Sequence, residues 1–342
     1  MVRIRFAWLL LLAAALLLNG CKQAWQVLPA QPPTSPATQE KPPLLPSLTS
    51  SPVQPSSDPT PTDLPLPTPT DLPPQPPPPA PGLYPGPAAM RTGEQAAPED
   101  WQSWPVLPVF SQRAQEIYDW GIAHGRDPAR FSKIGDCQSI AQYFIGCFDD
   151  PTEYNLGPYD QLMPTIEQFA GSWDRRSKAV RTGFNVASVL TEINADPAEC
   201  LPGEIPLSCE FRLHNPSFAL ISMETWTADR PTDTYQDYLS EIVEICIANG
   251  VLPIVSTKAD NLEGDHSINR MVAEVAANYD IPLWNWWAVA NDLPDQGLLE
   301  DGFHLTNGAN NFGDPAHMEK AWPNRNLSAL QLVASVWYSL GQ

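Results

Sequence analysis

The sequence predicts an α/β fold in which helices cover both faces of a parallel sheet of about five strands. Short apolar runs alternate with longer amphipathic segments throughout the C-terminal two thirds of the chain. Each apolar run is continuous, without polar alternation, which is typical of strands buried on both faces. In such sheets, functional sites form outside the carboxyl ends of the strands.

The elements follow in order from residue 109. The predicted strands are 131–135, a weaker one at 177–181, then 218–222, 251–256 and 281–286. The predicted helices are 109–124, 140–145, 163–169, 185–193, 234–249, 267–279 and 327–340. Gly125 and Gly250 directly follow the first and fifth of these helices and act as stop signals.

The first twenty residues have the pattern of a signal peptide. Arg3 and Arg5 precede an apolar run at 6–18 that is too short for a comfortable membrane span. The run ends in Leu-Asn-Gly-Cys, which resembles the lipobox of bacterial lipoproteins, whose cysteine is acylated and becomes the mature N-terminus. We therefore expect cleavage after residue 20, a lipid on Cys21 and an extracytoplasmic protein attached to the cell membrane. An uncleaved anchor, the alternative, leads to the same location.

Residues 21–100 form the second part of the chain, a lipidated cysteine followed by a Pro-rich stalk. This region contains more than half of the 40 prolines and few charges. Such a composition cannot bury a core, so we expect an extended, disordered polyproline-II segment that holds the domain at 101–342 away from the lipid surface. A role as a ligand for an aromatic groove is the alternative.

The net charge of -20 excludes several classes of partner. An acidic domain repels phosphate backbones and anionic lipid heads, so we expect no nucleic-acid partner and no strongly anionic substrate. His214, His266 and His317 have no second ligand at metal spacing, so the sequence predicts neither a metal nor a cofactor. We expect a monomer.

Five of the six cysteines follow Cys21, and one pair among them is predicted, while the pairing of Cys137, Cys147 and Cys246 stays open. Cys200 and Cys209 flank a loop with Pro and Gly, and they are the favoured disulfide in an oxidising compartment. Cys246 lies in an apolar helix and is expected to be buried. If the segment between Cys137 and Cys147 is helical, it separates them by about 15 Å, too far for a disulfide.

Candidate catalytic residues lie in two blocks far apart in sequence. Asp136, Cys137 and Ser139 follow the first strand, and Asp301 and His304 follow the last. An imidazole can take the proton of a nucleophile while a carboxylate fixes its tautomer. Because the sheet is parallel, both blocks and the loops at 224–226 and 257–260 open on one edge.

These residues resemble the SGNH/GDSL hydrolase family over residues 131–342. Gly-Asp-Cys at 135–137 stands where the family has Gly-Asp-Ser, Gly183 stands where a glycine N–H binds the oxyanion, and Asp301-x-x-His304 matches the terminal block. The resemblance implies a flavodoxin-like α/β/α sandwich and ester hydrolysis, with the N–H groups of Cys137 and Gly183 holding the oxyanion. Asp136 and Thr225 are expected beside them.

Two positions depart from the family pattern. Cys137 replaces the nucleophilic serine, and Trp226 stands where the family has an oxyanion-binding asparagine. An indole N–H donates only one hydrogen bond, and the ring reshapes the pocket. Three readings remain open: Cys137 is a thiol nucleophile, Ser139 takes over, or neither reacts and the site binds.

The sequence therefore favours a membrane-anchored hydrolase that cleaves an ester, for example an O-acyl group on a glycan. A catalytically impaired module that binds glycan or a partner protein through the same cleft is the alternative. Trp284, Trp286 and Trp287 could stack on sugar rings near this edge. Alternation along a strand places part of this group in the core.

Overall fold

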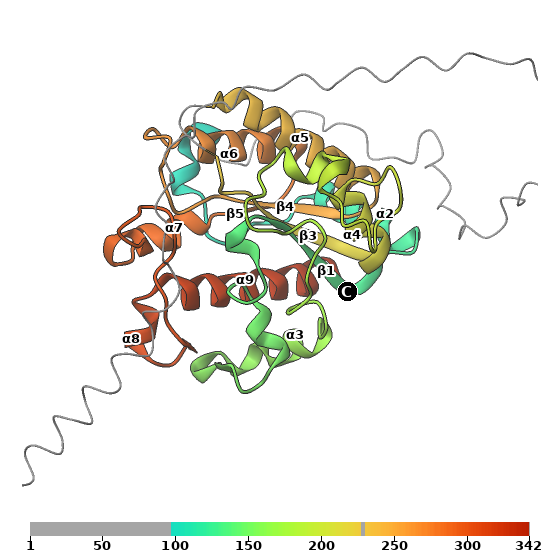
Figure 1. The fold of residues 1–342 in the computed structure, drawn as a ribbon. Coiled ribbons are helices and arrows are strands. Elements are labelled where there is room, and N and C mark those ends of the chain that lie inside the picture. Colours follow the sequence, from blue (N-terminus) through green and yellow to red (C-terminus); the bar gives the residue numbers. More distant parts are fainter. Residues whose placement is uncertain (1–96, 227–229, 342) are drawn as a thin grey trace, which may run out of the picture. The chain divides into compact units, whose positions relative to one another are not determined.

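A four-stranded parallel sheet forms the centre of the part of the chain that the computed structural model describes, residues 97–226 and 230–341 (Figure 1). Its strands, in spatial order, are β1 (Asp127–Gly135), β3 (Pro216–Ser222), β4 (Leu252–Ser256) and β5 (Leu283–Trp284). All three strand pairings are parallel. The predicted α/β class with a parallel sheet is confirmed.

A further segment lies beside β1 without becoming a full strand. Val180 forms a parallel bridge with Gly135, and the N–H of Gly135 donates to the carbonyl of Ala179 at 3.0 Å. If the strands of this sheet are renumbered along the chain and the segment around Val180 is counted as the second, their spatial order is 2-1-3-4-5. This is the order of flavodoxin-like sheets. The prediction of about five strands is thus corrected to four strands and one bridge. The strand expected at 177–181 is missing because a turn closes there, with the N–H of Val180 donating to the carbonyl of Ser177.

Helices cover both faces of the sheet, which makes three layers (Figure 1). Helices α5 and α6 pack together on one face, and α9 lies on the other, in contact with α2 and α3. The α-helices of the described residues are α2 (Gln112–Ala123), α3 (Met163–Gln168), α4 (Pro206–His214), α5 (Thr232–Ala248), α6 (Ser267–Tyr279), α7 (Trp286–Asn291), α8 (Pro315–Met318) and α9 (Ala321–Leu340). Short strands β2 (Tyr154–Asn155) and β6 (Asn310–Asn311) form a separate parallel pair.

Several predicted elements are wrong for local reasons. The helix expected at 140–145 is a turn, in which Ile145 takes a left-handed backbone with φ 54°. Two short 3-10 turns, η5 (Ser188–Leu190) and η6 (Glu192–Asn194), replace the helix expected at 185–193. The strand expected at 281–286 ends early because α7 begins at Trp286. Helix α4 was not predicted.

The predicted pair Cys200 and Cys209 is joined by a disulfide. Cys137, Cys147 and Cys246 are free thiols. Cys137 and Cys147 therefore stay unpaired even though the helix expected between them does not form.

The N-terminal predictions lie outside the described residues. They concern the signal peptide at 1–20, the lipidated Cys21 and the stalk up to residue 96. Within 97–226 and 230–341, every helix is too short or too polar to cross a membrane.

Buried His214 gives a testable pH dependence of stability. Its Nε2 lies 3.0 Å from the carbonyl oxygen of Phe131 and 3.2 Å from Oγ of Ser172. Burial, together with the charge of nearby Arg175, lowers the pKa of His214 to about 4. The folded protein thus holds a neutral imidazole at a pH where the unfolded chain binds a proton.

We expect the free energy of unfolding to fall by up to about 3 kcal/mol as the pH drops from about 6.5 to about 4. This loss comes from protonation of the unfolded imidazole, so it should be smaller in His214→Gln over the same window. Urea unfolding at intervals across this pH range measures both proteins. Parallel pH profiles would contradict the assignment.

Candidate active site

The turn after β1 begins at Gly135, a position with no room for a side chain. A Cβ on Gly135 would lie 2.0 Å from Oγ of Ser139 and 2.6 Å from the carbonyl oxygen of Ser222. Only a glycine therefore lets the end of β1 approach β3 this closely. The next residue, Asp136, is fully buried, and its Oδ1 accepts a hydrogen bond from the N–H of Gln138 at 2.9 Å.

The carboxylate of Asp136 joins the loops that follow β1 and β3. Its Oδ2 accepts hydrogen bonds from the N–H groups of Glu224 and Thr225 at 2.8 and 2.7 Å, and from Oγ1 of Thr225 at 2.8 Å. The sequence placed Asp136 and Thr225 among the oxyanion or substrate contacts. In the structure, both side chains hold the two loops together at the carboxyl edge of the sheet.

Cys137 and Ser139 differ in exposure within this turn. Cys137 is half-buried and free, and burial, reinforced by the carboxylates of Asp136 and Glu224, raises its pKa to about 11. Ser139 is buried, and its Oγ donates to the carbonyl of Ser222 at 3.3 Å. The serine hydroxyl therefore faces the protein interior, and the thiol is the more accessible of the two nucleophiles.

Asp301 and His304 form a preassembled pair. Nδ1 of His304 lies 2.6 Å from Oδ2 of Asp301, and both side chains are about half exposed. Oδ1 of Asp301 accepts the N–H groups of Phe303 and His304 at 3.0 and 2.9 Å. The hydrogen bond with His304, followed by these two backbone N–H groups, lowers the pKa of Asp301 to about 2. The carboxylate is thus ionised and orients the imidazole.

Gln138 connects the two blocks. Its Nε2 donates to the carbonyl of Phe303 at 3.0 Å, which ties the turn after β1 to the loop that carries His304. Within the described residues, no hydrogen bond joins His304 to the sulfur of Cys137. The structure therefore brings the two loops together without pairing the thiol and the imidazole.

A buried arginine contacts the turn after β1 and the end of β3. Arg325 of α9 is fully buried, and its Nη2 lies 2.5 Å from Oε1 of Glu224 and 2.7 Å from Oγ of Ser222. Its Nη1 donates to Oε1 of Gln138 at 3.2 Å. Sequence reasoning missed Gln138 and Arg325. The signal for Arg325 was present, since it is the one charged residue in the whole of helix α9.

Gly183 lies close to the turn. The N–H of Arg181 donates to the carbonyl of Gly135 at 3.4 Å, which places the following residues beside the end of β1. Gly183 is exposed, with φ 83°. In the described part of the chain, neither its N–H nor that of Cys137 donates to another residue.

Trp226 packs into the interior. The residue is 4% exposed, and its ring meets Tyr235 edge-on at 5.6 Å. Its Nε1 is buried, without a hydrogen-bond partner among the described residues. The indole expected at the position of an oxyanion-binding asparagine is therefore a core side chain.

The other candidate aromatic contacts are mostly core as well. Trp284 and Trp286 are 1% and 0% exposed, so neither can stack on a sugar ring. Trp287 is half-buried and packs against Trp101 at 4.8 Å. The sugar-stacking hypothesis is therefore wrong for Trp284 and Trp286.

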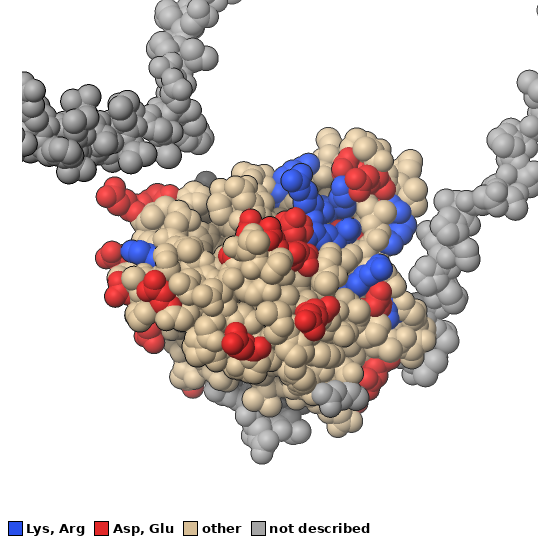
Figure 2. All heavy atoms as spheres, turned by 90° about the horizontal axis from the view of Figure 1, so that it is seen from below, with Lys and Arg blue, Asp and Glu red and all other residues tan. Residues whose placement is uncertain are grey.

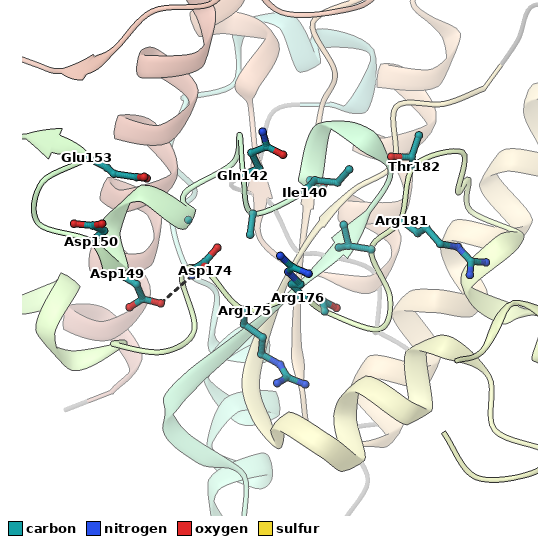
Figure 3. A pocket seen from close by; sticks show the side chains of 15 residues that line it. Ile140, Gln142, Asp149, Asp150, Glu153, Asp174, Arg175, Arg176, Arg181 and Thr182 are labelled. Atoms are coloured by element: carbon teal, nitrogen blue, oxygen red, sulfur yellow. Dashed lines mark hydrogen bonds between the residues drawn. The ribbon is translucent and has the colours of Figure 1, made fainter. Parts of the chain in front are cut away.

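A cavity of about 700 Å³ adjoins the turn (Figure 3). Ser139 and Ile140 line one part of it, and Arg181 and Thr182 line another, so it lies beside the turn, while Cys137, Gly183 and His304 are not among its lining residues. Its remaining lining residues are Ala141, Gln142, Gly146, Asp149, Asp150, Glu153, Asp174, Arg175, Arg176, Ser177 and Val180.

No protein-family model and no curated protein sequence matches the chain. A solved structure described as "a putative lipolytic protein of G-D-S-L family" from Desulfitobacterium hafniense is similar at 12% identity and a TM-score of 0.38. The match covers 60% of this chain and 99% of that chain. A likeness this distant carries no argument about activity.

The raised pKa of Cys137 predicts how its thiol reacts. We expect alkylation by iodoacetamide to accelerate about tenfold per pH unit from pH 7 to 10, because only the thiolate attacks and its fraction keeps rising toward a pKa near 11. Mass spectrometry of the Cys137 peptide measures the rate. Cys147, buried on the same segment, serves as the slow internal control. A rate that levels off below pH 8 would contradict the prediction.

Proposed function

We propose that the protein is an extracytoplasmic, membrane-anchored ester hydrolase of the SGNH/GDSL kind that removes an O-acyl group, for example from a glycan. The oriented Asp301–His304 pair carries this proposal. Its imidazole is fixed at Nδ1 by an ionised carboxylate, in a loop that Gln138 ties to the turn bearing Cys137. Both blocks lie at the edge of the sheet where sites of this fold form.

The proposed reaction passes through a thioester. Nε2 of His304 takes the proton of Cys137 as the sulfur attacks the acyl carbon, and the N–H groups of Cys137 and Gly183 hold the oxyanion. Collapse of this intermediate breaks the bond to the alcohol, which leaves with the proton from His304. Water, deprotonated by His304, then attacks the thioester, releasing the carboxylic acid and restoring the thiol.

The location rests on the N-terminal sequence. The charged start, the apolar run at 6–18 and Cys21 favour a lipid anchor, and the Pro-rich stretch up to residue 100 would serve as the stalk. The disulfide between Cys200 and Cys209 suits an oxidising compartment outside the cytoplasm.

Two observations favour the second candidate, a binding module without catalysis. The thiol pKa is raised, whereas a catalytic cysteine normally has a lowered one. The position of the asparagine donor is taken by a buried indole. In this alternative, the same cleft binds a glycan or a partner protein without cleaving it.

Esterase assays of single variants separate the two candidates. With the full chain in an uncharged detergent, we expect release of 4-nitrophenol from 4-nitrophenyl acetate. Cys137→Ala and His304→Ala should each lower kcat/KM by about 10³-fold or more, because both act on the reacting bond. Ser139→Ala should retain activity, since its hydroxyl faces the interior.

The pattern of losses also identifies the mechanism. Activity that survives Cys137→Ala but not His304→Ala would replace the thioester route with direct attack by water. An inert protein that becomes active in Cys137→Ser would instead favour the binding module.

The anchor has its own test. Cells grown with labelled palmitate should incorporate label into the protein, and Cys21→Ser should abolish this incorporation and release the protein from the membrane fraction. Cys246→Ser, which changes a buried thiol of the domain, is the control. Label retained in Cys21→Ser would disprove lipidation at this residue.

A further inference from the structure

The cavity beside the turn after β1 continues the proposed reaction site. Its lining includes Ser139, two residues after the proposed nucleophile, and Thr182, directly before the oxyanion glycine. If the N–H groups of Cys137 and Gly183 hold the ester carbonyl, another part of the same substrate molecule would lie next to this cavity.

Three arginines from one short segment line the cavity, but they are not equivalent. Arg175 is neutralised by Glu210, with Nε and Nη2 on the two carboxylate oxygens at 2.9 and 3.1 Å. Arg176 and Arg181 are exposed, and neither forms an ion pair within the described residues. The guanidinium of Arg181 lies over the ring of Phe184 at 4.3 Å. Nη2 of Arg181 also lies 3.5 Å from Oδ1 of Asn194. Two exposed cations without an ion pair among the described residues therefore line the cavity.

The opposite wall is acidic (Figure 3). Asp149 accepts hydrogen bonds from two backbone N–H groups, and Asp150 accepts both the N–H and the hydroxyl of Thr152. These two carboxylates shape the loop. Asp174 and Glu153 line the same wall without a side-chain hydrogen bond among the described residues. The cavity thus has exposed arginines on one side and carboxylates on the other.

We propose that this cavity binds one anionic group, a carboxylate or a phosphate, carried by the substrate close to its ester. This inference rests on the proposed function and names the substrate class of that site. Guanidinium groups pair with carboxylate and phosphate oxygens through charge-assisted hydrogen bonds, which are stronger than neutral ones. Arg176 and Arg181 are exposed and form no ion pair among the described residues, so both can form such hydrogen bonds with a ligand.

The acidic wall sets a limit on the substrate. Carboxylates across the cavity repel a second negative group and accept hydrogen bonds from hydroxyls. A sugar with one acidic group and free hydroxyls satisfies both walls, whereas a polyanionic chain does not. The net charge of -20 points the same way, because it disfavours highly charged anions overall. Lys and Arg side chains gather at one place on the face in Figure 2.

Binding to hydrolysis-inert sugars tests the inference. Titration calorimetry on the full chain, in an uncharged detergent without sugar headgroups, would compare glucuronate, glucose 6-phosphate and glucose. We expect one or both anionic sugars to bind and glucose to bind at least about tenfold more weakly. Comparing glucuronate with glucose 6-phosphate shows whether the cavity prefers a carboxylate or a phosphate.

Arginine variants locate the site. Arg176→Gln, Arg181→Gln and the double variant should weaken anion binding, the double variant by about tenfold or more, and leave the weak glucose binding unchanged. Arg270→Gln, which changes an exposed arginine on α6, is the matched control and should bind like the unmodified protein. Thermal unfolding of each variant verifies folding.

The outcomes distinguish this inference from the proposed hydrolysis. Equal binding of glucose and the anionic sugars, or anion binding unchanged in the double variant, would overturn it. The calorimetry needs no turnover. Anion-selective binding that depends on Arg176 and Arg181, in a chain that cleaves no ester, would therefore support the anion site and reject the hydrolase.

Discussion

The buried guanidinium of Arg325 holds the candidate site in place. A buried charge is costly unless it is paired and hydrogen-bonded, so the groups around Arg325 have little freedom to move. Those groups are Glu224 and Ser222 at the end of β3, and Gln138 in the turn after β1. Through the second hydrogen bond of Gln138, the same guanidinium reaches the loop that carries His304. Aromatic rings of Phe144, Trp284, Trp286 and Trp322 surround it at 5.0 to 5.9 Å.

The parts of the fold that could be predicted depend on local patterns. The bounds of α6 match the amphipathic run at 267–279, and β3 and β4 lie where continuous apolar runs stand in the sequence. The helix expected at 140–145 fails because the chain there closes on itself in a turn, with Ile145 in a left-handed conformation. Gly146 there approaches the carbonyl of Ala141 so closely that a Cβ would lie 2.1 Å from the oxygen. No periodicity in the sequence signals a contact of this kind.

In the candidate site, too, only the features that depend on nearby residues could be predicted. Asp301 and His304 could be predicted to meet because they are three residues apart in one loop, and the structure pairs them at 2.6 Å. The roles of Asp136 and Gln138 depend on partners 88 and 165 residues away, which a single sequence does not reveal. The burial of Trp226 could not be predicted either, because a motif gives the position of a residue along the chain but not the direction of its ring.

The surroundings of the turn after β1 affect how a nucleophile at position 137 can lose its proton. Burial, reinforced by the carboxylates of Asp136 and Glu224, raises the pKa of the Cys137 thiol, so a resting thiolate is disfavoured there. A serine hydroxyl at that point would need no resting anion, since it gives up its proton only as the bond forms. A cysteine in this turn therefore cannot rely on a preformed thiolate. In the proposed reaction, the imidazole of His304 has to take this proton during the attack, so the reaction requires the loop that carries His304 to approach the sulfur.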